Sequence, residues 1–486
     1  EARARPRGPW DAVVVGSGPN GLSAAIRLAQ EGAKVLVLEA KATPGGGMRT
    51  GEVTLPGFHH DLCSACHPTG ELSPFWRTLP LEAHGLRWVH PSASVAHPLD
   101  GEPAVLLSRD LTETADNLGP DARAYLRLCK PFKKRIDALL GDALAPLRWP
   151  KDPVTLARFG LRAALPATTL ARTAFRGPRA RALLAGNAGH SVLPLEQPVS
   201  GALGLLFALM GHAVDWPVVE GGSGNLARAL VRVLESLGGH VRTSRHVRGL
   251  DDLPPARVYL FDTSPAQLAN VCGPVLPPGY VARLRRYRYG PGSFKVDWAL
   301  SEPIPWKDPR VARASTVHLG GTLEEIAASE RAMWEGRHTE RPYMILVQAS
   351  AHDATRAPDG RHTGYAYAHV PAGATADRTA GREAQIERCA PGFRDTILAR
   401  RSWNADAWEA HNPNYVGGAI TGGVADVFQL FTRPVARLDP YATPNRRLFL
   451  CSASTPPGGG VHGMCGYWAA ESALRQLPRV APRRLK

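Results

Sequence analysis

The first forty residues constrain the fold more than any other part of the chain. Residues 10–15 form an apolar, β-branched run typical of a buried strand, and a glycine-rich turn follows at residues 16–21. Apolar residues at helical spacing come next, and a second buried run at residues 34–38 ends in Glu39. A strand, a glycine turn, a helix and a second strand with a terminal acid make up a dinucleotide-binding βαβ unit.

Each glycine of this turn has a physical purpose. Gly16 permits the tight turn, Gly18 lets the backbone approach a pyrophosphate, and Gly21 lets the helix pack closely on the strand. The helix N-terminus offers unpaired N–H groups to the phosphates, and Glu39 can accept hydrogen bonds from both hydroxyls of an adenosine ribose. Because its charge would repel a 2′-phosphate, FAD or NAD is favoured over NADP. The cofactor-binding residues expected here are Gly16, Gly18, Pro19, Gly21, Glu39 and Ala40.

The segment after the second strand favours FAD. A nicotinamide dehydrogenase normally continues into another helix, whereas here residues 44–50 form a glycine loop that contains an arginine. Beside a pyrophosphate, such a loop supplies backbone donors and a fixed positive charge. This loop resembles the Gly-Gly-x-x-Arg-Ser/Thr loop of the amine oxidase and phytoene dehydrogenase flavoproteins, which lies on the FAD phosphates. The resemblance implies that Gly46, Gly47 and Arg49 contact FAD.

The stretch from Cys63 to His67 contains the C-x-x-C-H spacing of c-type haem attachment. Haem attachment requires an export-linked compartment, and the basic N-terminal residues lack the apolar segment of a signal peptide. The surrounding residues instead resemble the hairpin after the glycine loop in phytoene dehydrogenase-like proteins related to the pyridine nucleotide-disulfide oxidoreductase-domain proteins. That resemblance places Phe58 and Asp61 where the family has an aromatic residue and an aspartate near the flavin. We expect neither haem nor a thioredoxin-like cysteine pair. His67 is either a packing histidine or a group at the substrate face of the flavin.

Charge and cysteine content narrow the partners and the compartment. The net charge of +15 is spread along the chain rather than gathered in long basic runs, so no nucleic-acid partner is expected. Seven scattered cysteines, an odd number, do not form a disulfide framework, and the expected compartment is reducing. No apolar run reaches the roughly 18 residues of a membrane span. The expected localisation is cytoplasmic, with peripheral membrane association as a further expectation.

Residues 71–212 show mostly amphipathic, basic helical patterns with links broken by proline. Two interpretations are compatible with each other. The segment forms a helical lobe that covers the cofactor, or it also forms a monotopic surface through which lipid-soluble substrates enter from a membrane.

The chain then returns to the cofactor domain. Residues 216–241 contain an extended entry, a glycine turn and a long amphipathic helix, but no second complete dinucleotide fingerprint, so we expect no permanently bound NAD(P). The segment is similar to the family's Pro-x-x-Gly-Gly motif. The resemblance implies that Val247 holds the adenine by backbone contacts, and that Asp262 ends the next core strand and belongs to the cofactor site.

A strand pattern at residues 294–300 points Phe294, Val296 and Trp298 to one face and Lys295 and Asp297 to the other. In amine oxidase relatives, a lysine on a strand of this lobe holds a water at flavin N5. Lys295 is therefore a candidate catalytic residue, with a solvated strand lysine as the alternative. Farther on, Ala419 replaces an acid that a related subgroup carries, which puts chemistry that needs that carboxylate in doubt.

The end of the chain holds a strand, a glycine turn and a helix that match the C-terminal FAD motif of the same family, with Ser452 where a glycine is usual. Reduction places negative charge on the flavin, and a helix N-terminus stabilises such charge. Gly463 and Met464 are expected to supply the N–H donors, and Ser454 and Val461 to contact FAD. His462 is either a substrate-side group or a loop histidine.

These segments predict an α/β fold: a Rossmann-type FAD-binding domain with an inserted α+β substrate-binding domain and a helical lobe. The expected FAD-binding segments are 1–70, 213–272 and 431–486, with the lobe at 71–212 and the substrate sheet at 273–430. The resemblance implies a dehydrogenase that transfers a hydride from an apolar, isoprenoid- or polyene-like substrate to flavin N5, with oxygen or a quinone as electron acceptor. The alternatives are an amine oxidase that releases hydrogen peroxide, and an FAD-containing isomerase or binding protein without net redox turnover. No metal site is expected.

Overall fold

The glycine-turn segment folds into the centre of a parallel sheet. In the computed structural model, which describes residues 10–478, β1 (Trp10–Val15) pairs in parallel with β2 (Val35–Leu38) and β10 (Ala256–Phe261). The outer strands are β9 (His240–Arg242) and β16 (Leu448–Leu450), which gives the order β16-β10-β1-β2-β9. The segment on which the signal-peptide expectation depends, residues 1–9, lies outside the described residues, as do residues 479–486 of the last expected FAD segment.

Helices cover both faces of this sheet, as buried parallel strands require. Along β1, Ala12 and Val14 face one hydrophobic core, whereas Val13 and Val15 face another. The first core is closed by α1 (Pro19–Gln30), α10 (Gly224–Ser236) and α17 (Met464–Leu474), and the second by α11 (Pro265–Cys272) and α12 (Pro278–Arg285). The Rossmann-type architecture expected from the sequence is confirmed.

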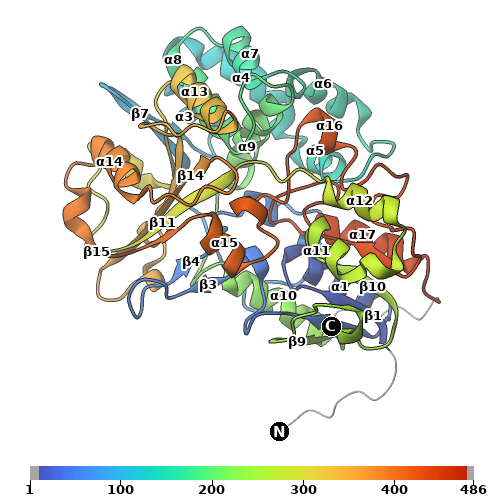
Figure 1. Cartoon of the computed structure of the whole chain (residues 1–486). Coiled ribbons are helices and arrows are strands. Elements are labelled where there is room, and N and C mark those ends of the chain that lie inside the picture. The colour runs from blue at the N-terminus through green and yellow to red at the C-terminus, as the bar shows by residue number, and fades with distance from the viewer. Residues whose placement is uncertain (1–9, 479–486) are drawn as a thin grey trace.

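A second sheet of seven strands has the order β15-β11-β14-β13-β12-β6-β7 and lies beside the first (Figure 1). Its neighbours are antiparallel except for β12 and β6. One face packs into its own core, which includes residues of α14 (Thr379–Cys389), and the other face looks toward the rest of the molecule. Its strands are β6 (Ala93–Leu99), β7 (Glu102–Leu107), β11 (Gly292–Leu300), β12 (Ala314–Leu319), β13 (Met344–Val347), β14 (His362–Val370) and β15 (Ile397–Trp403).

A helical lobe forms the top of the molecule in the view of Figure 1. The helical patterns expected within residues 71–212 form helices from Leu111 onward. The lobe consists of α3 (Leu111–Asp116), α4 (Ala122–Lys133), α5 (Ile136–Ala143), α6 (Pro153–Ala163), α7 (Ala167–Ala174), α8 (Pro178–Gly189) and α9 (Ser200–Val214), with α13 (Leu323–Trp334) packed on α8.

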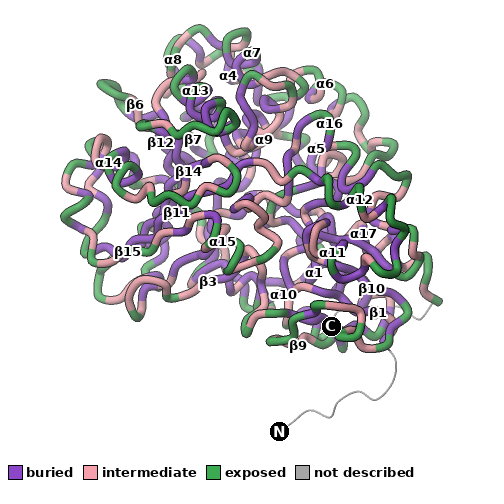
Figure 2. Tube along the Cα trace, in the orientation of Figure 1, coloured by how far each residue is buried: buried purple, intermediate pink, exposed green. Residues whose placement is uncertain are grey.

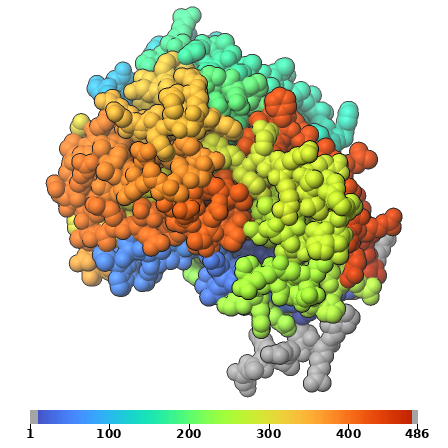
Figure 3. Space-filling view, viewed as in Figure 1, coloured from blue at the N-terminus to red at the C-terminus, as the bar shows by residue number. Residues whose placement is uncertain are grey.

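Short elements join the three parts. They are α2 (Pro68–Glu71), α15 (Ala405–His411), α16 (Val427–Leu430), the hairpin of β3 (Thr50–Gly51) with β4 (His60–Asp61), and the pair of β5 (Trp88–Val89) with β8 (Val218–Val219). Segments distant in sequence lie side by side: in Figure 3 the blue surface near residue 50 lies against the orange surface near residue 400. Buried, purple stretches of the chain are concentrated in the interior of the molecule, and exposed, green stretches lie mainly at its periphery (Figure 2).

The structure differs from the expected boundaries in two places. Residues 93–107, expected within the helical lobe, form a hairpin of the seven-stranded sheet, so helices of the lobe begin only at Leu111. The cause is a two-residue Asp-Gly turn between paired Leu99 and Glu102, in which Gly101 has a φ of 73°. The second segment of the sheet domain, expected from residue 273, begins at β11, because α12 packs in the core of the Rossmann domain.

Candidate active site

One cavity of about 900 Å³ extends from the parallel sheet to the helical lobe. It begins at the carboxyl ends of β1, β2 and β10, where open α/β sheets bind their ligands. Most residues expected to bind the cofactor line it together: Gly16, Gly18, Pro19, Glu39, Ala40, Gly46, Gly47, Arg49, Val247, Asp262, Ser454 and Val461. His462 also lines it. Gly21, Gly463, Met464, His67 and Lys295 are not in its wall.

The glycine turn forms a cradle that side chains would fill. A Cβ on Gly21 would lie 2.1 Å from the carbonyl oxygen of Gly16, so α1 can approach β1 only without a side chain there. A Cβ on Gly46 would lie 2.8 Å from the Cα of Gly18, which means that the glycine loop packs directly on the turn. Both backbones are thereby brought to the cavity, as contact with a pyrophosphate requires.

Glu39 ends β2 with both carboxylate oxygens engaged. Oε2 accepts the backbone N–H of Ser17 at 3.1 Å and its hydroxyl at 2.5 Å, and Oε1 accepts the backbone N–H of Lys41 and an Arg49 N–H, each at 2.8 Å. The Glu39–Arg49 pair is nearly fully buried. A ribose that binds Glu39 would have to share or replace these donors, so that ribose contact stays a prediction.

Asp262 ends β10 at the N-terminus of α1. Its Oδ2 accepts the backbone N–H of Gly21 at 2.8 Å, and burial raises the pKa of this carboxyl to about 7. The carboxyl group therefore takes up one of the helix N-terminal donors.

The far end of the cavity is apolar and aromatic. Tyr365 and Tyr367 line it from β14, whereas Ala366 and Ala368 between and beyond them pack into the core on the other face of the sheet. The sequence alternation in this strand carried that signal, but it was not recognised as part of the site. Other residues of this end are Phe159, His190, Leu203, Leu206, Phe207, Met210, Trp216, Ile345 and Val347.

Lys295 is placed differently from both expectations. The alternation along β11 is confirmed, since Phe294, Val296 and Trp298 pack in one core, but Lys295 is only 1% exposed and is not a solvated lysine. Its Nζ donates to the carbonyl oxygens of Asp61 and Leu62 at 2.8 and 3.0 Å, and to Asp297 at 2.8 Å. With three acceptors for its three protons, Lys295 ties β11 to the hairpin below the cavity.

The two candidate histidines are buried. His67 Nε2 shares a hydrogen bond with the hydroxyl of Ser223 at 2.7 Å, and its position outside the cavity wall fits the packing interpretation. His462 Nδ1 accepts the backbone N–H of Met464 at 3.0 Å, so that donor, expected to face the flavin, is already used. Burial lowers the pKa of both histidines to about 4, which makes them neutral.

Cys63 and Cys66 line the cavity as free, half-buried thiols. Burial raises the pKa of each, so neither has the depressed pKa of a reactive thiolate. Cys66 Sγ lies 3.2 Å from the hydroxyl of Thr316. Within residues 10–478, no group of three or more His, Cys, Asp or Glu side chains could hold a metal ion.

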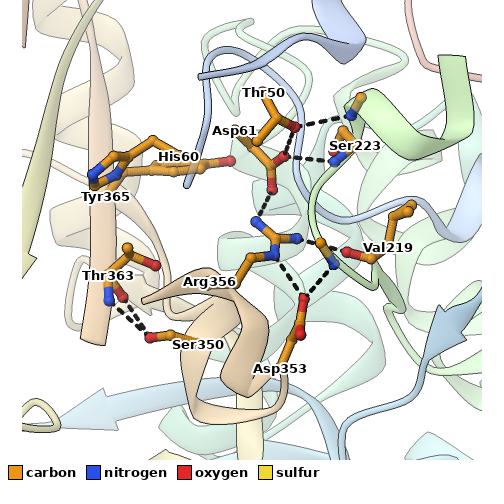
Figure 4. Close-up of polar contacts among 12 residues, drawn as sticks. Thr50, His60, Asp61, Val219, Ser223, Ser350, Asp353, Arg356, Thr363 and Tyr365 are labelled. Carbon is orange, nitrogen blue, oxygen red and sulfur yellow. Dashed lines mark hydrogen bonds and ion pairs between the residues drawn. The ribbon is translucent and has the colours of Figure 1, made fainter. Parts of the chain in front are cut away.

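A buried ionic network lies beneath the cavity (Figure 4). Arg356 donates to Asp61 at 2.7 Å, to Asp353 at 2.8 Å and to the carbonyl oxygen of Val219 at 2.8 Å. Asp61 also accepts the backbone N–H of Ser223 at 2.7 Å. Asp61 and Phe58 are therefore not in the cavity wall, and the aspartate instead joins the hairpin, the start of α10 and the seven-stranded sheet.

The cavity wall fits a polar ligand at its nucleotide-binding end. Four of its side chains carry buried polar atoms without a hydrogen-bond partner among the described residues: Asn20 Oδ1, Thr263 Oγ1, Arg433 Nε and His462 Nε2. Buried polar atoms normally find partners, so these atoms suit a bound group with donors and acceptors of its own.

Comparison with known proteins agrees with this geometry. The sequence model of the NAD(P)-binding Rossmann-like domain matches residues 14–79. Pyridine nucleotide-disulfide oxidoreductase domain-containing protein 2 of Rattus norvegicus is 27% identical over 97% of this chain and 94% of its own length. Hydroxyneurosporene desaturase of Cereibacter sphaeroides is 30% identical over 47% of this chain and 48% of its own. These similarities support an oxidoreductase with a Rossmann-like nucleotide-binding domain.

A solved structure extends the similarity of this oxidoreductase across the whole fold. Putrescine oxidase bound to putrescine has a TM-score of 0.59 and 17% identity, over 96% of this chain and 99% of that one. At this identity the likeness shows the shared architecture. The oxidoreductase thus combines this shared architecture with its own cavity wall. In that wall, Tyr365, Tyr367, His190 and Trp216 were not predicted from the sequence.

Proposed function

We propose that this oxidoreductase binds FAD and dehydrogenates an apolar, isoprenoid- or polyene-like substrate. The observation that supports this most is the single cavity that joins a dinucleotide cradle to an apolar chamber. In the proposal, Gly18 and Gly46 hold the pyrophosphate, Glu39 the ribose and Val247 the adenine. Bound FAD would supply a two-electron acceptor for a hydride from the substrate.

The apolar chamber has the properties that such a substrate requires. Leu203, Phe207, Met210 and Trp216 offer contact surface without charge, and they exclude water from the reacting carbon. Orientation of the donor carbon in this wall, rather than a charged catalytic group, then provides the rate enhancement.

The proposal includes substrate entry from a membrane surface. Exposed apolar side chains gather around α5–α6 and α16, which lie together in Figures 1 and 3: Leu147, Trp149, Val154, Leu161, Phe428 and Phe431. Phe159 of α6 and Leu430 of α16 line the cavity, so this surface borders its apolar end. Exposed Arg148, Lys151 and Arg158 among them suit anionic lipids. Among the described helices none is both long and apolar enough to span a bilayer.

The first experiment is an absorbance spectrum of the purified protein, followed by anaerobic mixing with polyenes and with amines. We expect an oxidised-flavin band that bleaches with a polyene donor. A Soret band, or a preparation that cannot be loaded with flavin, would refute the proposal. Re-oxidation of the bleached protein by oxygen or by a quinone then identifies the electron acceptor.

An amine oxidase is the second candidate, because Tyr365 and Tyr367 form an aromatic pair in the cavity wall, with ring centroids 6.5 Å apart. Aromatic pairs of this kind bind amine substrates well. Bleaching by an amine together with hydrogen peroxide release would favour this function. Flavin that no donor bleaches would favour an isomerase or a binding protein.

Membrane entry is tested with Trp149→Ser and Phe428→Ser against Leu398→Ser, an exposed leucine on β15 of the sheet domain. We expect the first two variants to lose co-sedimentation with vesicles that contain anionic lipid, and the control to keep it. Equal binding by all three would remove this surface from the proposal.

A further inference from the structure

Three histidines extend from the cavity into the protein, and the proposed function uses none of them. His190, at the end of α8, lines the cavity, whereas His318 on β12 and His97 on β6 are completely buried. The Nε2 atoms of His190 and His318 lie 2.9 Å apart, so they share a hydrogen bond. Parallel pairing of Val317 with Ala96 places His318 and His97 side by side on neighbouring strands. We call these three residues the histidine file.

Gly186 of α8 lies against both His318 and His97, and its lack of a side chain leaves space between their rings. A Cβ at Gly186 would lie 2.7 Å from His318 Nδ1 and 2.9 Å from His97 Nδ1. Both nitrogens are buried and have no hydrogen-bond partner among the described residues. They therefore face one small space, and their separation is within the span of one bridging water, which makes two hydrogen bonds of ordinary length.

The far end of the file reaches the surface. His97 Nε2 lies 2.7 Å from the carbonyl oxygen of Gly321. Gly321 is half-buried and directly precedes α13, where the exposed carboxylate of Glu325 accepts the N–H of Thr322. The file thus spans the distance from the cavity to an exposed carboxylate.

One carbonyl oxygen fixes the proton position at the far end of the file. Because Gly321 offers only an acceptor, His97 Nε2 must carry a proton, and its Nδ1 is then an acceptor in the neutral ring. In the arrangement that we infer, the bridging water donates to His97 Nδ1 and accepts from His318 Nδ1, and His318 Nε2 then accepts from His190 Nε2. His190 Nδ1 is then left with a free lone pair, and no hydrogen bond to it is found in the described part of the chain.

We propose that the histidine file conducts a proton from the substrate to the surface, with His190 Nδ1 as the group that takes it. This inference depends on the proposed function. A two-electron oxidation removes a hydride, with its two electrons, to the oxidised flavin, and a proton from the neighbouring carbon to His190 Nδ1, which leaves a double bond. His190 passes its Nε2 proton to His318, His318 passes its Nδ1 proton toward His97, and His97 releases its Nε2 proton beside Gly321. His190 is the catalytic residue, and His318 and His97 are positioning residues.

The electrostatics suit conduction rather than storage of a proton. Burial lowers the pKa of His190 to about 3 and that of His97 to about 4, and burial with the two neighbouring histidines also lowers the pKa of His318. A ring this weakly basic accepts a proton only from a strong acid, and a carbon next to a forming carbocation is such an acid. The charged groups nearest the file are Arg179 and Glu325 at His97, and His369 with its partner Glu330 near His190.

A purely structural role does not account for the buried nitrogens of His318 and His97. Two buried nitrogens without partners destabilise the fold, and apolar side chains of similar shape would avoid that cost. His212 shows the structural alternative: it is buried on α9, and its two ring nitrogens bind the hydroxyl of Tyr125 at 2.8 Å and the carbonyl oxygen of Ser108 at 2.8 Å. It is therefore the matched control.

The first test needs neither cofactor nor substrate. In protein labelled with ¹⁵N-histidine, NMR shift pairs assign each tautomer, with single His→Gln variants to identify the signals. We expect the Nε2–H tautomer for His190 and His97 and the Nδ1–H tautomer for His318. An Nε2–H tautomer of His318 would reverse the order of donors and overturn the inference, whatever the protein oxidises.

The second test uses the FAD-loaded protein and the donor that bleaches it. His190→Gln should slow anaerobic bleaching by roughly 100-fold or more, the range of one general base. His318→Gln should slow bleaching less than His190→Gln does, and it should reduce the solvent deuterium isotope effect on bleaching. Added imidazole should restore the bleaching rate of His190→Ala. FAD content and unfolding temperature report whether a variant is folded, and His212→Gln should bleach at the unchanged rate. If the folded His190→Gln variant bleached at the wild-type rate, the inference would be refuted and the proposed function would stand.

Discussion

Two carboxylates, Glu39 and Asp262, follow strands β2 and β10 at the nucleotide-binding end of the cavity. Their surroundings differ. Glu39 is surrounded by four donors, one of them the guanidinium of Arg49. Asp262 faces the N–H of Gly21, but burial dominates and raises its pKa to about 7. Asp262 is therefore suited to carry a proton near neutral pH.

Asp262→Asn should change how stability depends on pH in the cofactor-free protein. The folded pKa is raised above the unfolded value, so the stability that this carboxyl group contributes is fully present below about pH 4 and is lost as the pH rises through about 7. We expect a loss of about 2–4 kcal/mol across this window, given 1.36 kcal/mol per pKa unit. Urea unfolding at several pH values should show a flatter curve for Asp262→Asn. Parallel curves for the two proteins would contradict the prediction.

The positions of individual site residues could be predicted from the sequence where a local motif determines what they contact. The glycine positions and Glu39 follow from a βαβ unit within forty residues, and they meet as expected. Lys295 could not be placed, because its partners at Asp61 and Leu62 lie more than 230 positions away. No local pattern distinguishes a lysine that faces water from one that closes a distant hairpin.

At the scale of elements, α1 and α17 cross at very close range. A Cβ on Gly466 of α17 would lie 1.8 Å from the carbonyl oxygen of Asn20 in α1. A backbone atom cannot rotate away as a side chain can, so the two helices would have to separate.

Gly466→Ala should therefore destabilise the protein by about 1–3 kcal/mol, the range for an overpacked core. Gly141→Ala, in α5, is the matched control, because a Cβ there meets nothing within 4 Å. The control should gain up to about 1 kcal/mol from helix propensity. Thermal unfolding of both variants measures the difference, and equal shifts would refute close packing at this crossing.

The ionic network around Arg356 connects three elements without a direct strand pairing between them. Burial alone would raise the pKa of Asp61, but the Arg356 guanidinium and the N–H of Ser223 hold it below its usual value. Asp61 therefore contributes stability above pH 4 that is lost as the pH falls through its folded pKa.

Arg356→Met should cost about 3–5 kcal/mol, because it leaves two buried carboxylates without their cation. Arg313→Met removes a half-exposed ion pair with Glu113 and should cost less than about 1 kcal/mol. Denaturant unfolding at pH 7 compares them. A similar small cost for both would show that the network does not hold the hairpin.

Elements were predictable where one periodicity extends over several turns. Helices formed within the segment 111–214 of the predicted helical lobe, and α10 formed after the glycine turn as expected. The hairpin of β6 and β7 was missed although Asp100 and Gly101 mark its turn, because the expectation for the whole segment was set by the longer helical runs around it. Short strands depend on pairing with distant partners, here β12, and that information is not local.

At the scale of the whole molecule, the nucleotide-binding end is built from widely separated segments, which include Gly18, Val247, Asn414 and Val461. A ligand that contacts all of them binds only the folded chain, and it stabilises that chain by about 2.7 kcal/mol at a hundred times its Kd.

In the proposed function FAD is this ligand, so its removal should lower the unfolding temperature of the entire molecule in one transition. Differential scanning calorimetry with and without added FAD measures this. AMP, which covers only part of the site, should give a smaller shift. Separate transitions, with only one sensitive to FAD, would indicate that the parts unfold independently.

The pairing of α17 with α1 also has a consequence for biosynthesis. The ribosome produces β1 and α1 more than 400 residues before the strand β16 and the helix α17, which complete their sheet and cover Asn20. Until α17 has been made, α1 keeps an apolar face in water. Chaperone binding to ribosome-bound chains should therefore persist until α17 has emerged, and the cofactor can be held only after that.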